Sequence, residues 1–188
     1  MRLKGACVAK KFNWDAWIAL KSCRPLFAVL AYYSHRGLDT HGENMKPTLQ
    51  PGIKYQHEFL LPSSKTVPAL YPEADEFLAM PEVFATGFLV GFLEWACIKA
   101  VNPHLDWPAE QTLGTHIDVS HVAATPPGMK VTASVELIAV EGKKLTFRVE
   151  AHDGIDLISE GLHQRHIVNK EKFVARIGEK KNRFLNQE

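Results

Sequence analysis

Apolar and polar residues alternate with period two over much of the chain after Met45, a pattern typical of half-buried β-strands. The first alternating stretch covers residues 55–61. Four later stretches lie close together, at about 113–121, 131–137, 145–151 and 155–168. Turn sequences separate these four, at Thr125-Pro-Pro-Gly128, Glu141-Gly142 and Asp153-Gly154. The pattern therefore predicts an isolated first strand and then a run of antiparallel strands joined in sequence.

The segment from Pro81 to Pro103 shows no alternation and no polar stripe. Between Val83 and Ile98 its only charged residue is Glu94. Apolar side chains on every side predict a helix that is buried all round, ending before Pro103. A shorter helix is expected around 74–80, within a loop that is rich in proline.

A strand, a buried helix and an antiparallel meander make an α+β fold in which the sheet curls around the helix, the hot-dog arrangement. One sheet covers only part of such a helix, so we expect a second copy to complete it as a homodimer. Residues 1–44 lack clear alternation and are expected to be an N-terminal extension, or the product of an early start codon. The domain is expected at 45–177, followed by a polar C-terminal tail at 178–188.

Composition narrows the function classes. A formal net charge of +1 over 188 residues predicts neither nucleic-acid nor membrane-surface partners. The apolar run 25–33 is too short to span a bilayer, and no Ala-x-Ala-like cleavage site follows it. The three cysteines are far apart and form no CxxC pair, which favours a reducing cytoplasm.

Two titratable residues stand out against apolar surroundings. Glu94 lies in the middle of the apolar helix, where a carboxylate is costly unless it is paired. It is a candidate general base, or an acid of raised pKa, although a salt bridge across an interface would also explain it. His121 is in phase with Ile117 and Val119 and so is expected to face the helix. It is a candidate catalytic residue, with an ordinary core histidine as the alternative.

Thr86 lies near the predicted helix start, where it could simply cap the helix or could supply a nucleophilic or substrate-positioning hydroxyl. Gly114 and Gly87 could let backbone N–H groups approach a thioester carbonyl, although turn or packing roles fit them equally. No metal or cofactor is expected, because the sequence has no HExxH, Cys/His cluster, GxGxxG or P-loop motif. His163 and His166 are three residues apart in a predicted strand, so their rings should face opposite sides.

Several longer motifs resemble the fluoroacetyl-CoA thioesterase-like family of hot-dog proteins over about 46–177. They are Lys65-Thr-Val-x-x-Leu-Tyr-Pro-Glu73, Pro81-Glu-Val-Phe-Ala-Thr-Gly-Phe88, Glu94-Trp-Ala-Cys97, Leu113-Gly-Thr115, His121-x-Ala-Ala-Thr-Pro-Pro-Gly128, Val140-Glu-Gly142 and Ala151-His-Asp-Gly154. The resemblance implies a homodimer with a CoA-binding groove near the subunit interface.

The resemblance also places the family's catalytic threonine, glutamate and histidine on Thr86, Glu94 and His121. It implies that Gly114 helps to hold the thioester carbonyl. The aromatic residues that guard the acyl pocket in the fluoroacetate-specific member correspond to Phe77 and Met80. Since Met80 is a flexible thioether, the resemblance leaves the acyl group of the substrate open.

The sequence thus predicts an acyl-CoA thioesterase that hydrolyses a short acyl-CoA, with a plain, substituted or halogenated acyl group, to the carboxylate and CoA. CoA enters as part of the substrate, and no separate cofactor is expected. A non-catalytic acyl-CoA-binding module and a hot-dog enoyl-CoA hydratase are the alternatives. The hydratase class generally uses an Asp/His pair at the helix start, which this chain lacks there.

Overall fold

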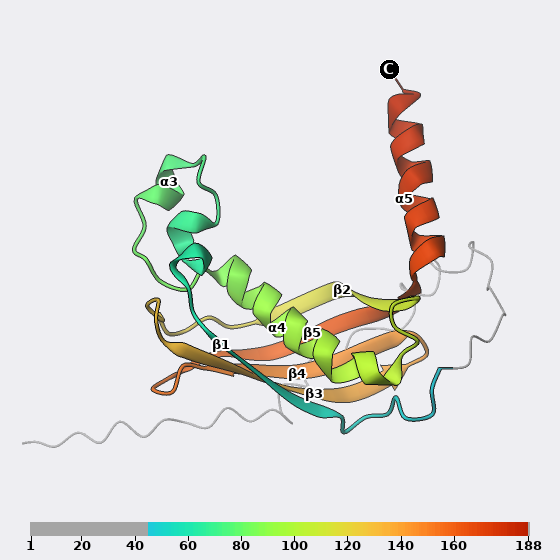
Figure 1. Ribbon diagram of the computed structural model, residues 1–188, viewed down its shortest axis with the longest axis horizontal. Coiled ribbons are helices and arrows are strands. Elements are labelled where there is room, and N and C mark those ends of the chain that lie inside the picture. Colours follow the sequence, from blue (N-terminus) through green and yellow to red (C-terminus); the bar gives the residue numbers. More distant parts are fainter. Residues whose placement is uncertain (1–44, 188) are drawn as a thin grey trace, which may run out of the picture. The chain divides into compact units, whose positions relative to one another are not determined.

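The computed structural model describes residues 45–187, which form one antiparallel sheet and the helices around it. The strands follow the sheet order β1-β3-β4-β5-β2 (Figure 1). Their bounds are β1 Lys54–Leu60, β2 Glu110–Val119, β3 Lys130–Glu141, β4 Lys144–His152 and β5 Leu157–Asn169. All five predicted strands are present.

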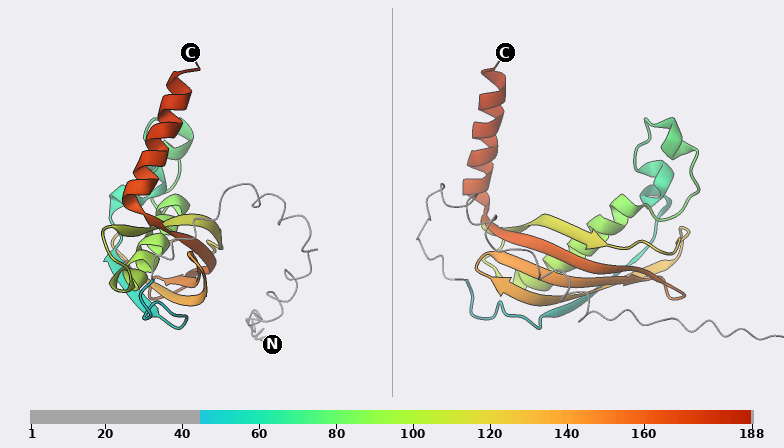
Figure 2. Two further views of the ribbon diagram at one scale, coloured as in Figure 1. Left: turned by 90° about the vertical axis from the view of Figure 1, so that its right-hand side faces the viewer. Right: turned by 180° about the vertical axis from the view of Figure 1, so that it is seen from behind.

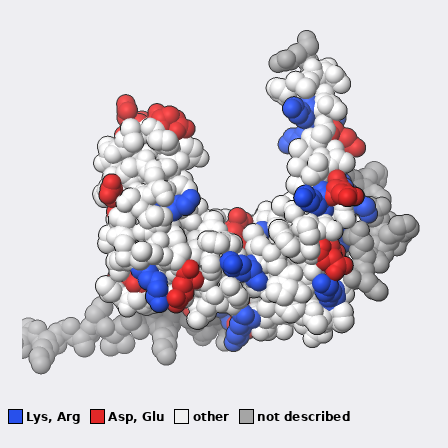
Figure 3. Space-filling view, viewed as in Figure 1, with Lys and Arg blue, Asp and Glu red and all other residues white. Residues whose placement is uncertain are grey.

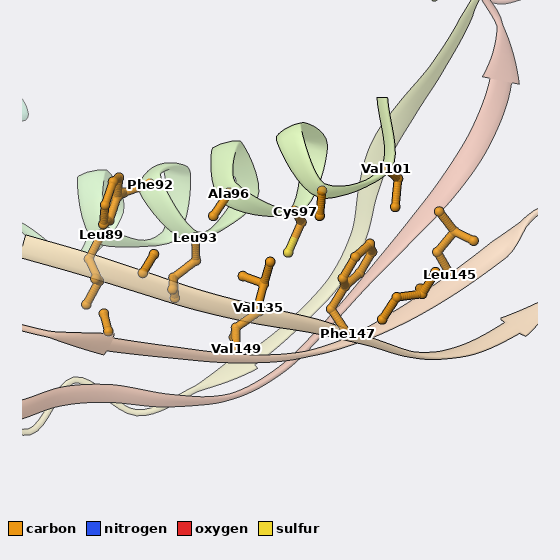
Figure 4. Packing of buried hydrophobic residues seen from close by; sticks show 14 of the residues in the cluster. Leu89, Phe92, Leu93, Ala96, Cys97, Val101, Val135, Leu145, Phe147 and Val149 are labelled. Atoms are coloured by element: carbon orange, nitrogen blue, oxygen red, sulfur yellow. The ribbon is translucent and has the colours of Figure 1, made fainter. Parts of the chain in front are cut away.

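The central helix α4, Thr86–Val101, lies across the curled sheet and supplies much of the core. Leu89, Phe92, Leu93, Ala96, Cys97 and Val101 point from α4 toward the sheet (Figure 4). They meet Val135, Leu145, Phe147 and Val149 of β3 and β4. The helix gives way to a 3-10 turn, Asn102–His104, whose Pro103 lacks the N–H that a longer α-helix would need.

Within residues 45–187, nothing covers the opposite side of α4. Thr86, Gly87, Gly91 and Trp95 are exposed, and Glu94 is partly exposed. The prediction of a helix buried all round is therefore wrong for the single protomer, because a one-layer sheet reaches only one side of it. An uncovered helix face that is largely apolar is unfavourable in water and calls for a further covering layer.

The β2 strand departs from its predicted phase at a β-bulge. Leu113, Thr115, Ile117 and Val119 were expected on one inward face, yet Thr112 is buried and Thr115 is exposed. The pairing of β2 with β5 shifts register between Gly114 and His116. Because a bulge adds one residue to a strand, the inward side changes from the even to the odd positions there.

Two further segments project from the same side of the sheet as α4, one at each end of that helix (Figures 1 and 2). The short helix α3, Asp75–Leu78, stands beyond the start of α4, after the 3-10 turns Ser63–Lys65 and Val67–Ala69. Helix α5, Lys170–Leu185, stands at the other end. The expected tail from 178 is thus helical as far as Leu185.

The expected N-terminal extension, residues 1–44, lies outside the described residues. Within 45–187 no helix is both long and apolar enough to cross a lipid bilayer.

Candidate active site

The start of α4 brings together two of the three predicted catalytic residues. Thr86 is the first helical residue, and the capping position before it is Ala85. The Thr86 hydroxyl does not cap the helix but lies 2.8 Å from Nδ1 of His121. A hydroxyl hydrogen-bonded to an imidazole is the arrangement that general-base catalysis needs.

His121 follows the end of β2, and its ring is half-buried beside Thr86. Burial lowers the pKa of His121 below its ordinary value, which favours the neutral ring. The Nε2 atom is buried and has no hydrogen-bond partner among residues 45–187. When Nδ1 accepts the Thr86 hydrogen, Nε2 carries the ring's own hydrogen and needs an acceptor from elsewhere.

The third predicted catalytic residue, Glu94, belongs to a second polar group in the middle of α4. Its Oε1 atom lies 3.3 Å from Nη1 of Arg165, which is almost fully buried on β5. Thr112 holds that guanidinium, because its hydroxyl accepts from Nε at 2.9 Å and its carbonyl from Nη2 at 2.7 Å. The carboxylate thus pairs with a rigidly held cation within its own protomer. This ion pair is internal, whereas the sequence suggested a bridge across an interface.

His163 completes this group and is 1% exposed. Its Nδ1 lies 2.8 Å from the His116 carbonyl oxygen, which can only accept, so Nδ1 carries the hydrogen. The other nitrogen, Nε2, then accepts from Arg165 Nη1 at 3.0 Å. Burial lowers the pKa of His163 and supports the same neutral form. Arg165 therefore donates to both Glu94 and His163.

Gly114 lies against Glu94, as expected for a residue of the site. A Cβ atom at position 114 would overlap Glu94 Oε1 and lie 3.2 Å from Cε1 of His163. The strand can approach the carboxylate this closely only because glycine has no side chain. A cavity of about 400 Å³ opens here, lined by Glu94 and Val90 of α4, by 114–117 of β2 and by His163.

The two polar groups are not in contact within one protomer. Thr86 and Glu94 are eight residues apart on α4, or roughly 12 Å at the rise of an α-helix. Glu94 bonds to Arg165, whereas His121 bonds to Thr86.

The predicted substrate-binding residues are divided in the same way. Gly87 lines a second, largely apolar cavity of about 420 Å³ between β1 and the uncovered side of α4. Phe77 packs on Tyr71 with ring centroids 5.2 Å apart, and Met80 is 53% exposed. Neither Phe77 nor Met80 lines these two cavities of the protomer.

No cluster of three or more His, Cys, Asp or Glu side chains that could hold a metal ion occurs in the described part of the chain. His163 is buried whereas His166 is exposed, as their spacing in β5 predicted.

Sequence reasoning missed Arg165 and the role of His163 beside it. A signal was present, since Arg165 shares its strand phase with the buried Gly161 and Ile167. A charged residue at an inward position of a strand needs a buried partner of opposite charge. The nearest carboxylate on the facing helix is Glu94.

Comparison with known proteins assigns this arrangement to a family. The family model described as FlK, fluoroacetyl-CoA-specific thioesterase, matches residues 70–171. Fluoroacetyl-CoA thioesterase from Streptantibioticus cattleyicolor is 52% identical over 136 residues, 72% of this chain and 97% of that protein.

Solved structures agree. A variant of the fluoroacetyl-CoA-specific thioesterase FlK, in complex with fluoroacetate and CoA, is 53% identical with a TM-score of 0.65, covering 66% of this chain and 99% of that one. A hot-dog-like protein from Thermanaerovibrio acidaminovorans matches with a TM-score of 0.59 at 19% identity, covering 69% and 91%, which confirms the predicted fold. The chain therefore belongs to the fluoroacetyl-CoA-specific thioesterase family, whose members are thioester hydrolases with the hot-dog fold.

Proposed function

We propose that the chain hydrolyses the thioester of a short acyl-CoA, with fluoroacetyl-CoA among its candidate substrates, to release the carboxylate and CoA. The observation that carries the proposal is the Thr86–His121 hydrogen bond at the start of α4, in a chain that is 52% identical to a fluoroacetyl-CoA thioesterase. A neutral imidazole bonded to a hydroxyl can accept the proton that either threonine attack or water attack releases.

The proposed reaction consumes one water molecule. Attack on the thioester carbonyl gives a tetrahedral oxyanion, which a backbone N–H near Gly114 stabilises. His121 takes the proton of the attacking hydroxyl and returns it to the departing CoA sulfur. Thr86 either attacks, forming an ester that water then cleaves, or orients the attacking water. Both routes need the same base.

We further propose that the active unit is a homodimer in which Glu94 of one copy serves His121 of the other. The uncovered side of α4 and the free edge of β2, which borders only β5 within residues 45–187, favour a second copy. The buried Nε2 atom of His121 needs an acceptor, and the Glu94 carboxylate of a second copy can supply one. Joining them gives a hydroxyl, an imidazole and a carboxylate in series, the order found in catalytic triads.

Phe77 and Met80 are proposed to guard the acyl group. They lie on the segment beyond the start of α4, the end that carries Thr86 and His121. A screen for thiol release across acetyl-, fluoroacetyl-, propionyl- and longer acyl-CoA identifies the preferred group. Binding without thiol release would instead indicate a non-catalytic module. For location we propose the cytoplasm, a reducing compartment that suits the free, buried Cys97.

Mixed dimers test the shared site directly. Purified Glu94→Gln and His121→Ala chains, each inactive alone, are mixed and allowed to exchange subunits. In a shared site half of the dimers would contain one intact site, so about a quarter of the wild-type activity should return. Mixing Glu94→Gln with itself is the control. No recovery, with exchange verified by mass, would contradict a site shared between subunits.

A further inference from the structure

Helix α5 buries none of its own residues, which is unusual for a helix of this length. Each of its residues from 170 to 185 is exposed. Its base is held by a hydrogen bond from the Lys170 N–H to the Ala109 carbonyl, and its start is capped by the Asn169 side chain. Isolated helices of this length are marginal in water and are normally stabilised by packing an apolar face.

The helix does carry such a face. Its large apolar residues are Phe173, Val174, Ile177, Phe184 and Leu185, all exposed. On a helical projection they fall within about a third of the circumference, and such a stripe is suited to packing on another surface. The remainder is strongly basic. Six Lys or Arg side chains and two Glu give α5 a surplus of four positive charges.

A surface of the opposite kind exists on the same chain. The α3 segment, residues 71–82, carries four acidic side chains and no Lys or Arg. The acidic residues are Glu73, Asp75, Glu76 and Glu82. Tyr71, Leu78 and Met80 of this segment are large apolar side chains that are about half exposed. Figure 3 shows acidic atoms at the top of this segment and mostly basic atoms along α5.

The α3 segment and α5 cannot meet within one protomer, because they stand at opposite ends of α4 (Figures 1 and 2). Both rise on the side of the sheet that carries α4. A twofold axis that places each Glu94 beside the other copy's Thr86 and His121 must run the two α4 helices antiparallel. It therefore sets the α5 end of each copy beside the α3 end of the other, in two equivalent contacts.

We propose that α5 of one protomer packs against the α3 segment of a second copy of this chain, and so holds Phe77 and Met80 over that copy's active site. The inference rests on the dimer of the proposed function. It adds that α5 of each copy forms part of the substrate pocket of the other copy. The apolar stripe of α5 meets Tyr71, Leu78 and Met80, and its basic residues face Glu73, Asp75 and Glu76.

Zero-length carbodiimide cross-linking of the full chain tests the contact, since it joins only amines and carboxylates that touch. Dimers formed from a mixture of ¹⁵N-labelled and unlabelled chains are cross-linked, digested and measured by mass spectrometry. The expected product joins a lysine of 170–185 to a carboxylate of 71–82 in peptides of mixed isotope content. Products of one isotope only, or α5 joined only to residues 1–44, would overturn the proposal.

Charge reversal supplies a functional readout. Lys180→Glu with Lys181→Glu should raise KM for a short acyl-CoA about fivefold with little change in kcat, because losing exposed ion pairs loosens the contact without touching the reacting groups. Adding Glu73→Lys and Glu76→Lys should restore KM. Lys54→Glu with Lys130→Glu, an equal charge change on β1 and β3 and outside both segments, is the matched control. An unchanged KM in the Lys180→Glu, Lys181→Glu variant would contradict the contact. So would a KM that stays high after Glu73→Lys and Glu76→Lys are added.

A lipid surface is the competing partner for a basic amphipathic helix, and co-sedimentation with phosphatidylserine vesicles tests it. Vesicle binding that depends on Lys180 and Lys181, without mixed-isotope cross-links, would overturn the proposal. Recovery of activity in the mixed dimers above, again without these cross-links, would leave the proposed function standing and remove only this inference.

Discussion

The start and the middle of α4 carry their polar groups in contrasting ways. At the start, Thr86 and His121 form a neutral pair, and the buried imidazole Nε2 has no hydrogen-bond partner in the part of the chain that the structure describes. In the middle, Glu94 is tied to a guanidinium that is itself fixed by Thr112 and His163. The first group is unfinished within the protomer, whereas the second is strongly constrained.

This difference indicates that one copy could supply the proton acceptor of a site and the other copy the carboxylate that supports it. A proton acceptor must change its bonding during a reaction, so an incomplete pair suits the reacting end. A carboxylate that supports an imidazole must keep its position and its charge, and Arg165 serves that purpose for Glu94. One rigid group from one copy and one reactive group from the other would together make a whole site.

Replacing Glu94 in the middle of α4, or His121 beside its start, should have the largest effect on kcat. Glu94→Gln and His121→Ala should each lower kcat on a short acyl-CoA by at least about 100-fold, because each removes a group that manages protons. Thiol-release kinetics measure this, with circular dichroism to show that both variants fold. Near-normal turnover in either folded variant would contradict a catalytic role for the residue that it replaces.

A substitution beside the rigid group should come next. Gly114→Ala places a methyl group on Glu94 Oε1, so the carboxylate must shift. Because small displacements of catalytic groups are costly, kcat should fall about 10- to 100-fold. Gln56→Ala, a change at an exposed residue of β1, is the control. Equal kinetics for the two variants would show that the position of Glu94 is not critical.

Weakening the hydrogen bonds that hold Arg165 beside Glu94 should have a smaller effect on kcat. Thr112→Val removes the hydroxyl that accepts from Arg165 Nε, at a cost of about 1–3 kcal/mol in the free energy of unfolding. We expect kcat to fall by less than it does for Gly114→Ala, since the Thr112 carbonyl still holds Nη2. Thr132→Val, which loses only an exposed bond to Glu58, is the control for denaturant unfolding. A fully stable Thr112→Val protein would contradict the view of a rigid group.

The smallest expected effect is in the pH profile, which tests whether His121 acts as the base. Burial lowers the pKa of His121, so the neutral ring persists below the ordinary histidine value of about 6.5. As the base, His121 must be neutral, so kcat/KM should fall as the pH drops below the pKa of this ring. A carboxylate of the second copy at Nε2 raises that pKa, so the acid limb of Glu94→Gln should lie at lower pH than that of the wild type. An acid limb that does not move in Glu94→Gln would show that Glu94 does not face His121.

Much of the architecture was predictable from local pattern. Period-two alternation located all five strands, and the uncharged stretch before Pro103 located α4. Glu94 and His121 stood out because a titratable group among apolar residues is costly, and that cost can be read from neighbours in the chain. The hot-dog fold followed from a single apolar helix that needed a sheet around it.

Tertiary structure alone decided how these parts meet. The bulge after Gly114 reversed the phase of β2, because the extra residue is left unpaired with β5 and leaves no periodic signal in the sequence. Arg165 bonds to Glu94, which is 71 residues away in the sequence, and the order of the strands brings the two together. The sequence by itself determined which residues had to be buried and which groups were costly to bury. Their partners depend on long-range pairing and on the side of α4 that one sheet cannot reach, which no local pattern encodes.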